Sequence, residues 1–402
     1  MIGYFPTPYK DEFIYSILAR YHQISSNKSE HITANELFTI SMREINMDLF
    51  PYAKKLENRL KHFDFCNAVE IIEKYSFFNY YYKLLSYAPN NRFQSLMLEE
   101  RSGWIGNELY RHDISQYNDK YYKFCLDCFE EDLKIDLPYW RISHNLPGVT
   151  YCNRHNCKLV RSDVKFNGKK FVVLSNEVKI SDIPLLSDYE EELLKLITEE
   201  TNYIFNCKEN ISEYVTPYIS YLYDLGYIED YTINEKKLKE HFMYFYSDNI
   251  CKVLNINKDY VISHVIKKIK SVSKEIPPLF QILFLIFCNK KIKDLKENNP
   301  ISTPFNKVVL KNCCNCFNGI FIHNCSLRFR GKVLWGKYKC SICEKIYETD
   351  AKDKNLSVRY GVKFSEQVME LLFIEDLSVS EICSKLHISK TELKNYLITR
   401  NR

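Results

Sequence analysis

The stretches Cys125-Leu126-Asp127-Cys128 and Cys152-Asn153-Arg154-His155 determine how this chain is organised. Each presents two metal-binding side chains separated by two residues, and 23 residues lie between the two pairs. Thiolates and a neutral imidazole at this spacing are typical ligands of a tetrahedral zinc ion. We therefore predict a structural CCCH zinc finger with ligands Cys125, Cys128, Cys152 and His155, with Cys157 and His144 as alternative ligands.

A second group of four cysteines lies nearer the C-terminal end. The pair Cys313 and Cys316 is matched by the pair Cys340 and Cys343, which predicts a four-cysteine zinc ribbon and brings the expected metal content to two structural Zn²⁺ ions. For the first group the alternative is buried free cysteine, which is common in protein cores. A thioredoxin-like redox pair is disfavoured because no βαβ pattern surrounds Cys125.

The final residues carry the start signals of short helices. An apolar helix face is formed by Phe364, Val368, Leu371 and Leu372. Two capping boxes follow, Ser378 with Glu381 and Ser389 with Glu392. This pattern predicts a helix-turn-helix whose second helix directs polar side chains outward to DNA, namely Lys390, Thr391, Lys394 and Asn395. His387 occupies the turn where many such motifs have glycine, and a three-helix packing module is the alternative.

The distribution of charge along the chain supports a nucleic-acid partner for the C-terminal part. The whole chain has a net charge of +5, but the segment from Lys307 onward has 17 basic residues against 10 acidic ones. Between the two cysteine pairs of the second group, basic residues alternate with aromatic ones, a mixture that can contact phosphates and stack on bases. We name Arg328, Arg330 and Lys332 as candidate DNA contacts, with a solvated ribbon face as the alternative.

Other features limit the class of function. No signal peptide precedes the cysteines, so we expect a reducing, cytoplasmic location, in a bacterium and associated with the nucleoid. The longest apolar run, Leu279 to Cys288, is about half of the roughly 20 residues that a membrane span needs, so we expect a buried helix and no membrane partner. No catalytic constellation is found. His144 beside a zinc-stapled loop leaves a nuclease or DNA-processing enzyme as an alternative.

These patterns predict a mainly α, multidomain fold with helical domains, two small zinc modules and a C-terminal helix-turn-helix. Apolar residues at helical spacing, beginning with Phe13, Ile14 and Ile17, predict that the N-terminal part is helical. The expected boundaries are 1–118 for the N-terminal helical domain, 119–165 for the CCCH finger, 166–306 for a helical middle domain, 307–350 for the four-cysteine ribbon and 351–402 for the helix-turn-helix.

Three groups of residues resemble a known family. Phe5-Pro6-Thr7-Pro8-Tyr9 leads into the segment 11–22, and Tyr139-Trp140-Arg141 is followed by Leu146-Pro147-Gly148 within the first finger. Together with the cysteine knuckles, these stretches are similar to the TniQ/TnsD family of transposon target-selection proteins. The stretch Phe242 to Leu295, the ribbon and the terminal helices resemble the longer TnsD branch.

The resemblance implies a non-catalytic adaptor. Such a protein binds a double-stranded DNA attachment site, or a guide-RNA effector in some members, and recruits an AAA+ ATPase that in turn activates the transposase. TnsD-like features favour direct reading of an attachment site. Because members with different targets share the N-terminal domain, we expect it to contact the ATPase. Its polar residues Asp11, Glu12, Arg20 and His22 are the candidate contacts, with core packing as the alternative.

Overall fold

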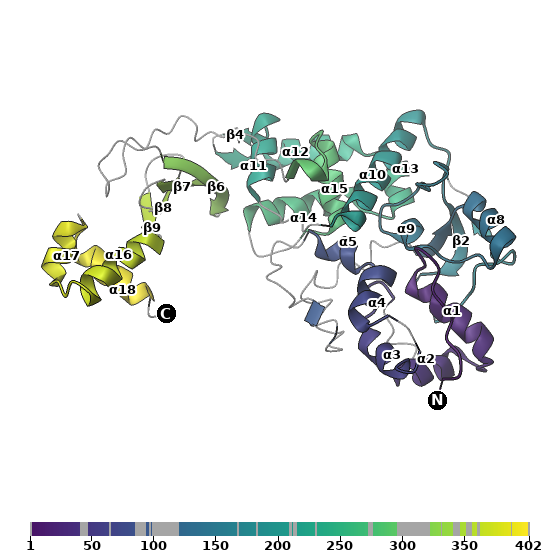
Figure 1. Cartoon of the computed structure of the whole chain (residues 1–402). Coiled ribbons are helices and arrows are strands. Elements are labelled where there is room, and N and C mark those ends of the chain that lie inside the picture. The colour runs from purple at the N-terminus through teal and green to yellow at the C-terminus, as the bar shows by residue number, and fades with distance from the viewer. Residues whose placement is uncertain are drawn as a thin grey trace. The chain divides into compact units, whose positions relative to one another are not determined.

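The computed structural model of the chain divides into two compact units (Figure 1). The first consists of Met1–Tyr214, Leu238–Ile266 and Ser273–Glu297, and the second of Val215–Lys237, Lys267–Val272 and Asn298–Arg402. The structure describes residues 2–40, 47–63, 66–84, 94–95, 98, 120–166, 169–181, 184–208, 211, 215–229, 231–271, 276–295, 322–330, 332–340, 346–350, 356–359, 362–386 and 388–400. Helices dominate these residues, as predicted.

The first unit begins with short helices that carry their own start signals. They are α1 (Ile14–Ser25), α2 (Glu30–Phe38), α3 (Ala53–Arg59), α4 (Ala68–Tyr75) and α5 (Phe78–Tyr82). Ser29 caps α2, and Asn67 forms a capping box with Glu70 at the start of α4. The apolar face predicted for the first helix is buried, and Ile14 and Ile17 are fully inaccessible to solvent.

A small antiparallel sheet follows, and it carries the first cysteine group. Its strands are β1 (Tyr121–Phe124), β2 (Val160–Lys165) and β3 (Ile180–Ser181), in that order. Helix α8 (Leu126–Ile135) starts directly after β1, and the single turn α9 (Ile142–Asn145) lies between the two knuckles.

Aromatic side chains join α1 to this sheet in one core. The rings of Tyr15 and Tyr122 stack with centroids 4.3 Å apart, and Trp140 lies against Tyr122 at 5.1 Å. The backbone is joined as well, since Phe13 N donates to the Trp140 carbonyl at 2.9 Å. The N-terminal helices and the finger are therefore packed around shared side chains, and the boundary at residue 118 stays a prediction.

Further helices complete the first unit. They are α10 (Asp188–Asn206), most of α12 (Glu235–Phe245), α13 (Asp248–Leu254), most of α14 (Lys258–Lys270), α15 (Pro278–Phe287) and the 3₁₀ turn η3 (Ile292–Leu295). Pro278 occupies the first position of α15, where its missing N–H costs nothing, and the helix is buried along nearly its whole length as predicted. Among the described residues, no helix combines the length and apolar character needed to cross a membrane.

The Leu146-Pro147-Gly148 stretch packs against these helices. Gly148 has a φ of +88°, and a Cβ built there would lie 2.8 Å from Leu279 Cδ1 of α15 and 3.2 Å from Ile197 Cγ2 of α10. The Pro147 carbonyl accepts a hydrogen bond from Thr201 Oγ1 at 3.3 Å. Glycine is required here both for its backbone conformation and for the close approach of the helices.

The second unit combines a sheet with short helices. After α11 (Val215–Asp224) come the two-residue strands β4 (Ile228–Glu229) and β5 (Thr232–Ile233). A four-stranded antiparallel sheet in sequential order consists of β6 (Ile322–Arg330), β7 (Val333–Cys340), β8 (Ile346–Asp350) and β9 (Leu356–Arg359). The chain continues into α16 (Val362–Phe373), α17 (Val379–Lys385) and α18 (Lys390–Arg400).

The three terminal helices share a small apolar core. Val368 of α16, Ile382 of α17 and Leu393 of α18 are buried together, along with Ile388 of the intervening turn. Ser378 caps α17 in a capping box with Glu381, as predicted. The second predicted box involves Glu392, whose side chain lies outside the described part, as does His387. A DNA-binding role for these helices stays a prediction.

Candidate metal centre

The four predicted ligands of the first group come together from two knuckles. Cys125 follows β1 as the N-cap of α8, where its sulfur accepts a hydrogen bond from Cys128 N in the first turn of the helix. Cys152 and His155 lie on the tight turn that the bridge between Tyr151 and Lys158 closes. The ligand atoms of all four residues lie within 4.8 Å of one another.

The separations match a tetrahedral zinc site. Nδ1 of His155 is 3.4 Å from Cys125 Sγ, 3.4 Å from Cys128 Sγ and 3.7 Å from Cys152 Sγ, and the last two sulfurs are 3.8 Å apart. With Zn–S distances of about 2.3 Å and Zn–N distances of about 2.0–2.1 Å, donors in a tetrahedron lie roughly 3.5–3.8 Å apart. A three-sulfur, one-nitrogen set of this size fits Zn²⁺.

Contacts among the sulfurs shift their pKa values in opposite directions. A hydrogen bond from the Cys128 thiol lowers the pKa of Cys152 to about 2, and the same contact raises the pKa of Cys128. Burial raises the pKa of Cys125. Zinc ligands must be thiolates, so a bound zinc ion would displace the protons that the raised pKa values favour on Cys125 and Cys128.

A carboxylate orients the histidine from behind. Nε2 of His155 donates to Glu131 Oε1 at 3.0 Å, and this contact raises the pKa of His155. Arg154 holds the other oxygen of Glu131 at 2.6 Å. Such a contact fixes which ring nitrogen faces the metal. Glu131 is not among the residues predicted from the sequence, although its place three residues after Cys128, on the same helix face, was the available signal.

The two alternative ligands are also close to the cluster. Cys157 Sγ is 3.3 Å from Cys125 Sγ, and His144 Nε2 is 3.9 Å from Cys128 Sγ. His144 is buried, and its Nδ1 has no hydrogen-bond partner among the described residues. Cys157 lies within reach of Cys125 but is not in the group that unites Cys125, Cys128, Cys152 and His155.

Most of the second cysteine group falls outside the described residues. This applies to Cys313, Cys316 and Cys343, and Cys340 ends β7 with a side chain that the structure does not describe. The second zinc ion stays a prediction. In the sequence, Cys313 and Cys316 precede β6, Cys340 ends β7, and Cys343 lies between β7 and β8.

The predicted DNA contacts fall into two groups. On the sheet, Arg328 forms a bidentate ion pair with the buried Glu348, at 2.7 Å to both oxygens, while Lys332 is exposed. On α18, Lys390, Thr391 and Lys394 are exposed. The side chains of Arg330 and Asn395 lie outside the described part.

The N-terminal polar residues are largely engaged within their own domain. Glu12 is fully buried and pairs with Arg20 at 2.6 Å, and Arg20 also lies over the Tyr9 ring at 4.2 Å. Asp11 accepts a hydrogen bond from Ser143 N at 3.2 Å. His22 is partly exposed, with Nδ1 2.7 Å from Thr33 Oγ1. These contacts give the motif a packing role, and Asp11 and His22 are the two members that are partly exposed.

Comparison with known proteins agrees with this geometry. Residues 3–159 match the TniQ family model, and this span runs from the Phe5-Pro6 turn through α1 to the last sulfur of the cluster. No curated protein matches the chain. The matched span contains all four residues of the Cys/His cluster.

Proposed function

We propose that the protein is a target-selection adaptor of a transposon, of the TnsD type. It binds a double-stranded DNA attachment site and recruits an AAA+ ATPase, and through it the transposase, without catalysing a reaction itself. The observation that carries this proposal is the TniQ match over residues 3–159. Within this span, the N-terminal helices and the domain that holds the Cys/His cluster are packed in one core.

The second unit supports direct DNA binding. It holds the basic segment from Lys307 onward, and α18 presents exposed Lys390, Thr391 and Lys394 after a short turn. A helix with exposed polar residues in its first turns is the kind of element that enters the major groove. The zinc ions have a structural role in this proposal, since Cys125, Cys128 and Cys152 are buried and, with His155, complete a four-ligand set.

The nuclease alternative has less support. His144 is only 3% exposed, so its ring does not face a solvent-accessible substrate path. A general base must come within about 3 Å of the water or hydroxyl it activates.

A test uses the full-length protein, because α1 shares its core with the finger and a fragment lacking residues 1–118 would expose Tyr122 and Trp140. Purified protein is incubated with DNA from an insertion junction, with and without the AAA+ ATPase encoded beside it. A sequence-specific mobility shift and co-purification of the ATPase are expected, with plasmid left intact in Mg²⁺ or Mn²⁺. Plasmid cleavage would favour the nuclease. Co-purification of a guide-RNA complex in place of direct DNA binding would favour the effector-adaptor alternative.

A further inference from the structure

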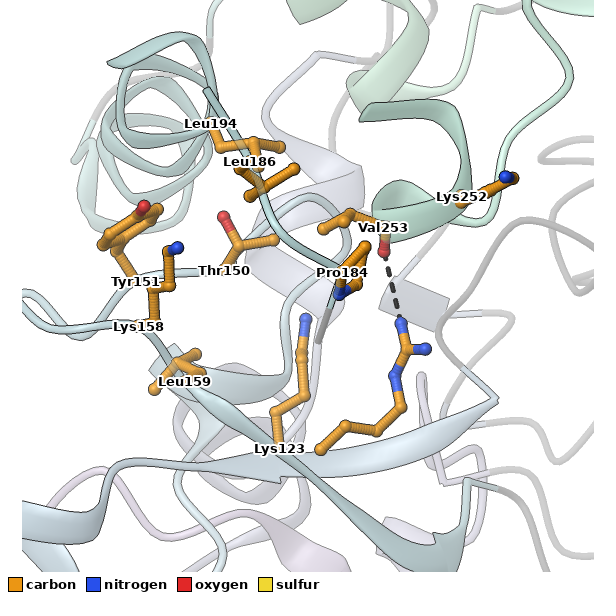
Figure 2. A pocket seen from close by; sticks show the side chains of 11 residues that line it. Lys123, Thr150, Tyr151, Lys158, Leu159, Pro184, Leu186, Leu194, Lys252 and Val253 are labelled. Atoms are coloured by element: carbon orange, nitrogen blue, oxygen red, sulfur yellow. Dashed lines mark hydrogen bonds between the residues drawn. The ribbon is translucent and has the colours of Figure 1, made fainter. Parts of the chain in front are cut away.

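The single turn α9 carries a buried histidine, His144, whose two neighbours in the chain are anchored to other segments. Asn145 Oδ1 accepts a hydrogen bond from Lys123 N of β1 at 2.8 Å, and Asn145 Nδ2 donates to the Lys123 carbonyl at 3.2 Å. These contacts use the Lys123 backbone, while the side chain of Lys123 lines a cavity of about 380 Å³ (Figure 2). Ser143 N donates to Asp11 Oδ1 at 3.2 Å. The anchored turn limits where the His144 ring can lie.

The His144 ring lies against one sulfur of the metal centre. The residue is 3% exposed, and its Nε2 is 3.9 Å from Cys128 Sγ. Its Nδ1 has no hydrogen-bond partner among the described residues. Nδ1 of His155, in contrast, lies within 3.7 Å of three sulfurs, and His144 is not in the group of four clustered ligands. His144 is therefore placed beside the ligand set and outside it.

A metal-bound Cys128 sulfur determines the direction of this contact. A thiolate on zinc has lost its proton, so it can only accept a hydrogen bond. Nε2 without a proton would turn its lone pair toward a negative sulfur, whereas Nε2–H donates to that sulfur. The same direction holds for a neutral ring and for an imidazolium ring, so it does not depend on the state of Nδ1.

The buried ligand set has negative charge to disperse. Three thiolates and one neutral imidazole around Zn²⁺ leave one net negative charge, and buried charge is costly unless hydrogen bonds meet it. Cys125 Sγ accepts from Cys128 N at 3.5 Å. Arg154 Nη1 lies 3.9 Å from Cys128 Sγ, but the Arg154 side chain is 55% exposed and pairs with Glu131. His144 adds a donor from the buried side, where low polarity strengthens a hydrogen bond.

We propose that His144 is a positioning residue of the metal centre. Its Nε2–H donates to the Cys128 sulfur, holds that thiolate on the metal and lowers its reactivity toward electrophiles. A donor has this effect because it draws electron density from the sulfur, and the free thiolate is the reactive form of cysteine. The proposal goes beyond target selection, since it depends on metal binding by the first group and not on which DNA or ATPase the protein meets.

Cobalt substitution of the full-length protein gives the first test. Co²⁺ bound to thiolates has a sulfur-to-metal charge-transfer band in the near ultraviolet. His144→Phe keeps a ring and removes the donor, so the band should move to lower energy as the sulfur lone pairs lose their stabilisation. His144→Gln places an amide N–H about as far from the backbone as Nε2 and should restore the wild-type band. A band that is unchanged in Phe, or restored by Phe and not by Gln, would overturn the proposal, because the ring would then act only through packing.

Thiol reactivity gives the second test. The zinc-loaded protein is treated with iodoacetamide, and mass spectrometry follows alkylation of Cys128. The rate should rise by about tenfold in His144→Phe, the lower end of the usual effect of losing a contact behind a metal ligand. His144→Gln should keep the wild-type rate, as should the control His31→Phe, which changes an exposed histidine of α2. Equal rates in the wild type and in His144→Phe would contradict the proposed role.

The wild-type protein provides a test that does not depend on the folding of His144→Phe. In protein labelled with ¹⁵N-histidine and loaded with ¹¹³Cd²⁺, the Nε2–H proton of His144 should couple to the metal through the hydrogen bond. This signal should be missing in His144→Gln, which assigns it. An Nε2 without a proton would overturn the proposal. Failure of the first group to bind any metal would overturn it too, and the DNA and ATPase measurements would still judge the proposed function separately.

Discussion

Nε2 of His155 donates to Glu131 Oε1 at 3.0 Å, and this contact turns Nδ1 of the same ring toward the sulfurs of Cys125 and Cys128, each 3.4 Å away. One carboxylate on α8 thus selects the nitrogen that faces the metal position. The knuckle that carries Cys128 also carries the residue that orients the histidine of the other knuckle.

Glu131→Gln should weaken zinc binding by about 10–100-fold, the usual cost of losing a carboxylate behind a ligating histidine. Competition with a chromophoric chelator measures this affinity. The matched control is Glu130→Gln, which removes an exposed charge from the neighbouring position on α8. If both variants bind zinc equally well, Glu131 does not orient His155.

The protein purified without chelators should contain two zinc ions per chain. Cys128→Ser should remove one equivalent, because it takes away one of three clustered sulfurs, and should lower the yield of soluble protein since metal binding supplies folding free energy. Elemental analysis gives the count. Cys251→Ser, at a half-buried cysteine outside both groups, is the control and should keep both ions.

Arg20→Met should lower the free energy of unfolding by about 3–5 kcal/mol, since it leaves the fully buried Glu12 carboxylate without its partner. Thermal unfolding of the first unit measures the effect. The control is Lys74→Met, which breaks an exposed pair with Glu70 and should leave the Tm unchanged. An unchanged Tm in Arg20→Met would mean that another group compensates Glu12.

Gly148→Ala should destabilise the first unit by about 1–3 kcal/mol, because the new Cβ would overlap Leu279 Cδ1 in addition to straining the backbone. Calorimetry separates the two causes by comparison with Gly226→Ala. Gly226 has a φ of +69°, but no heavy atom of the described residues lies within 4 Å of the position that a Cβ would take, so it reports backbone strain without overlap. Equal losses in the two variants would rule out a packing role for Gly148.

Combined Lys390→Ala and Lys394→Ala should abolish specific DNA binding while zinc content and folding are kept. If both contact phosphates, the slope of log K against log salt should fall by about 0.9 for each. Fluorescence anisotropy over a salt series measures it. Lys385→Ala serves as the control, because it removes an exposed charge of α17 that pairs with Glu375. An unchanged affinity and slope in the double variant would make the terminal helices a packing or partner module.

Local patterns were sufficient for the four clustered residues of the candidate metal centre and for several helix starts. Cys125, Cys128, Cys152 and His155 were readable from spacing alone, because a tetrahedral ion needs two short knuckles whose geometry is set within a few residues. The capping box of Ser378 and the proline start of α15 were readable for the same reason, since caps depend on neighbours three residues away.

Tertiary structure decided what depends on contacts between distant segments. Glu12 and Arg20 have the sequence appearance of a free polar face, yet they are buried because the finger folds over α1, which brings Arg141 into a β-bridge with Glu12. Lys123 and Arg161 come to line one cavity only when β1 and β2 pair beside α10 and α13. Spacing along the chain carries no information on such burial, because the desolvation of a charge is set by elements packed against it from elsewhere in the sequence.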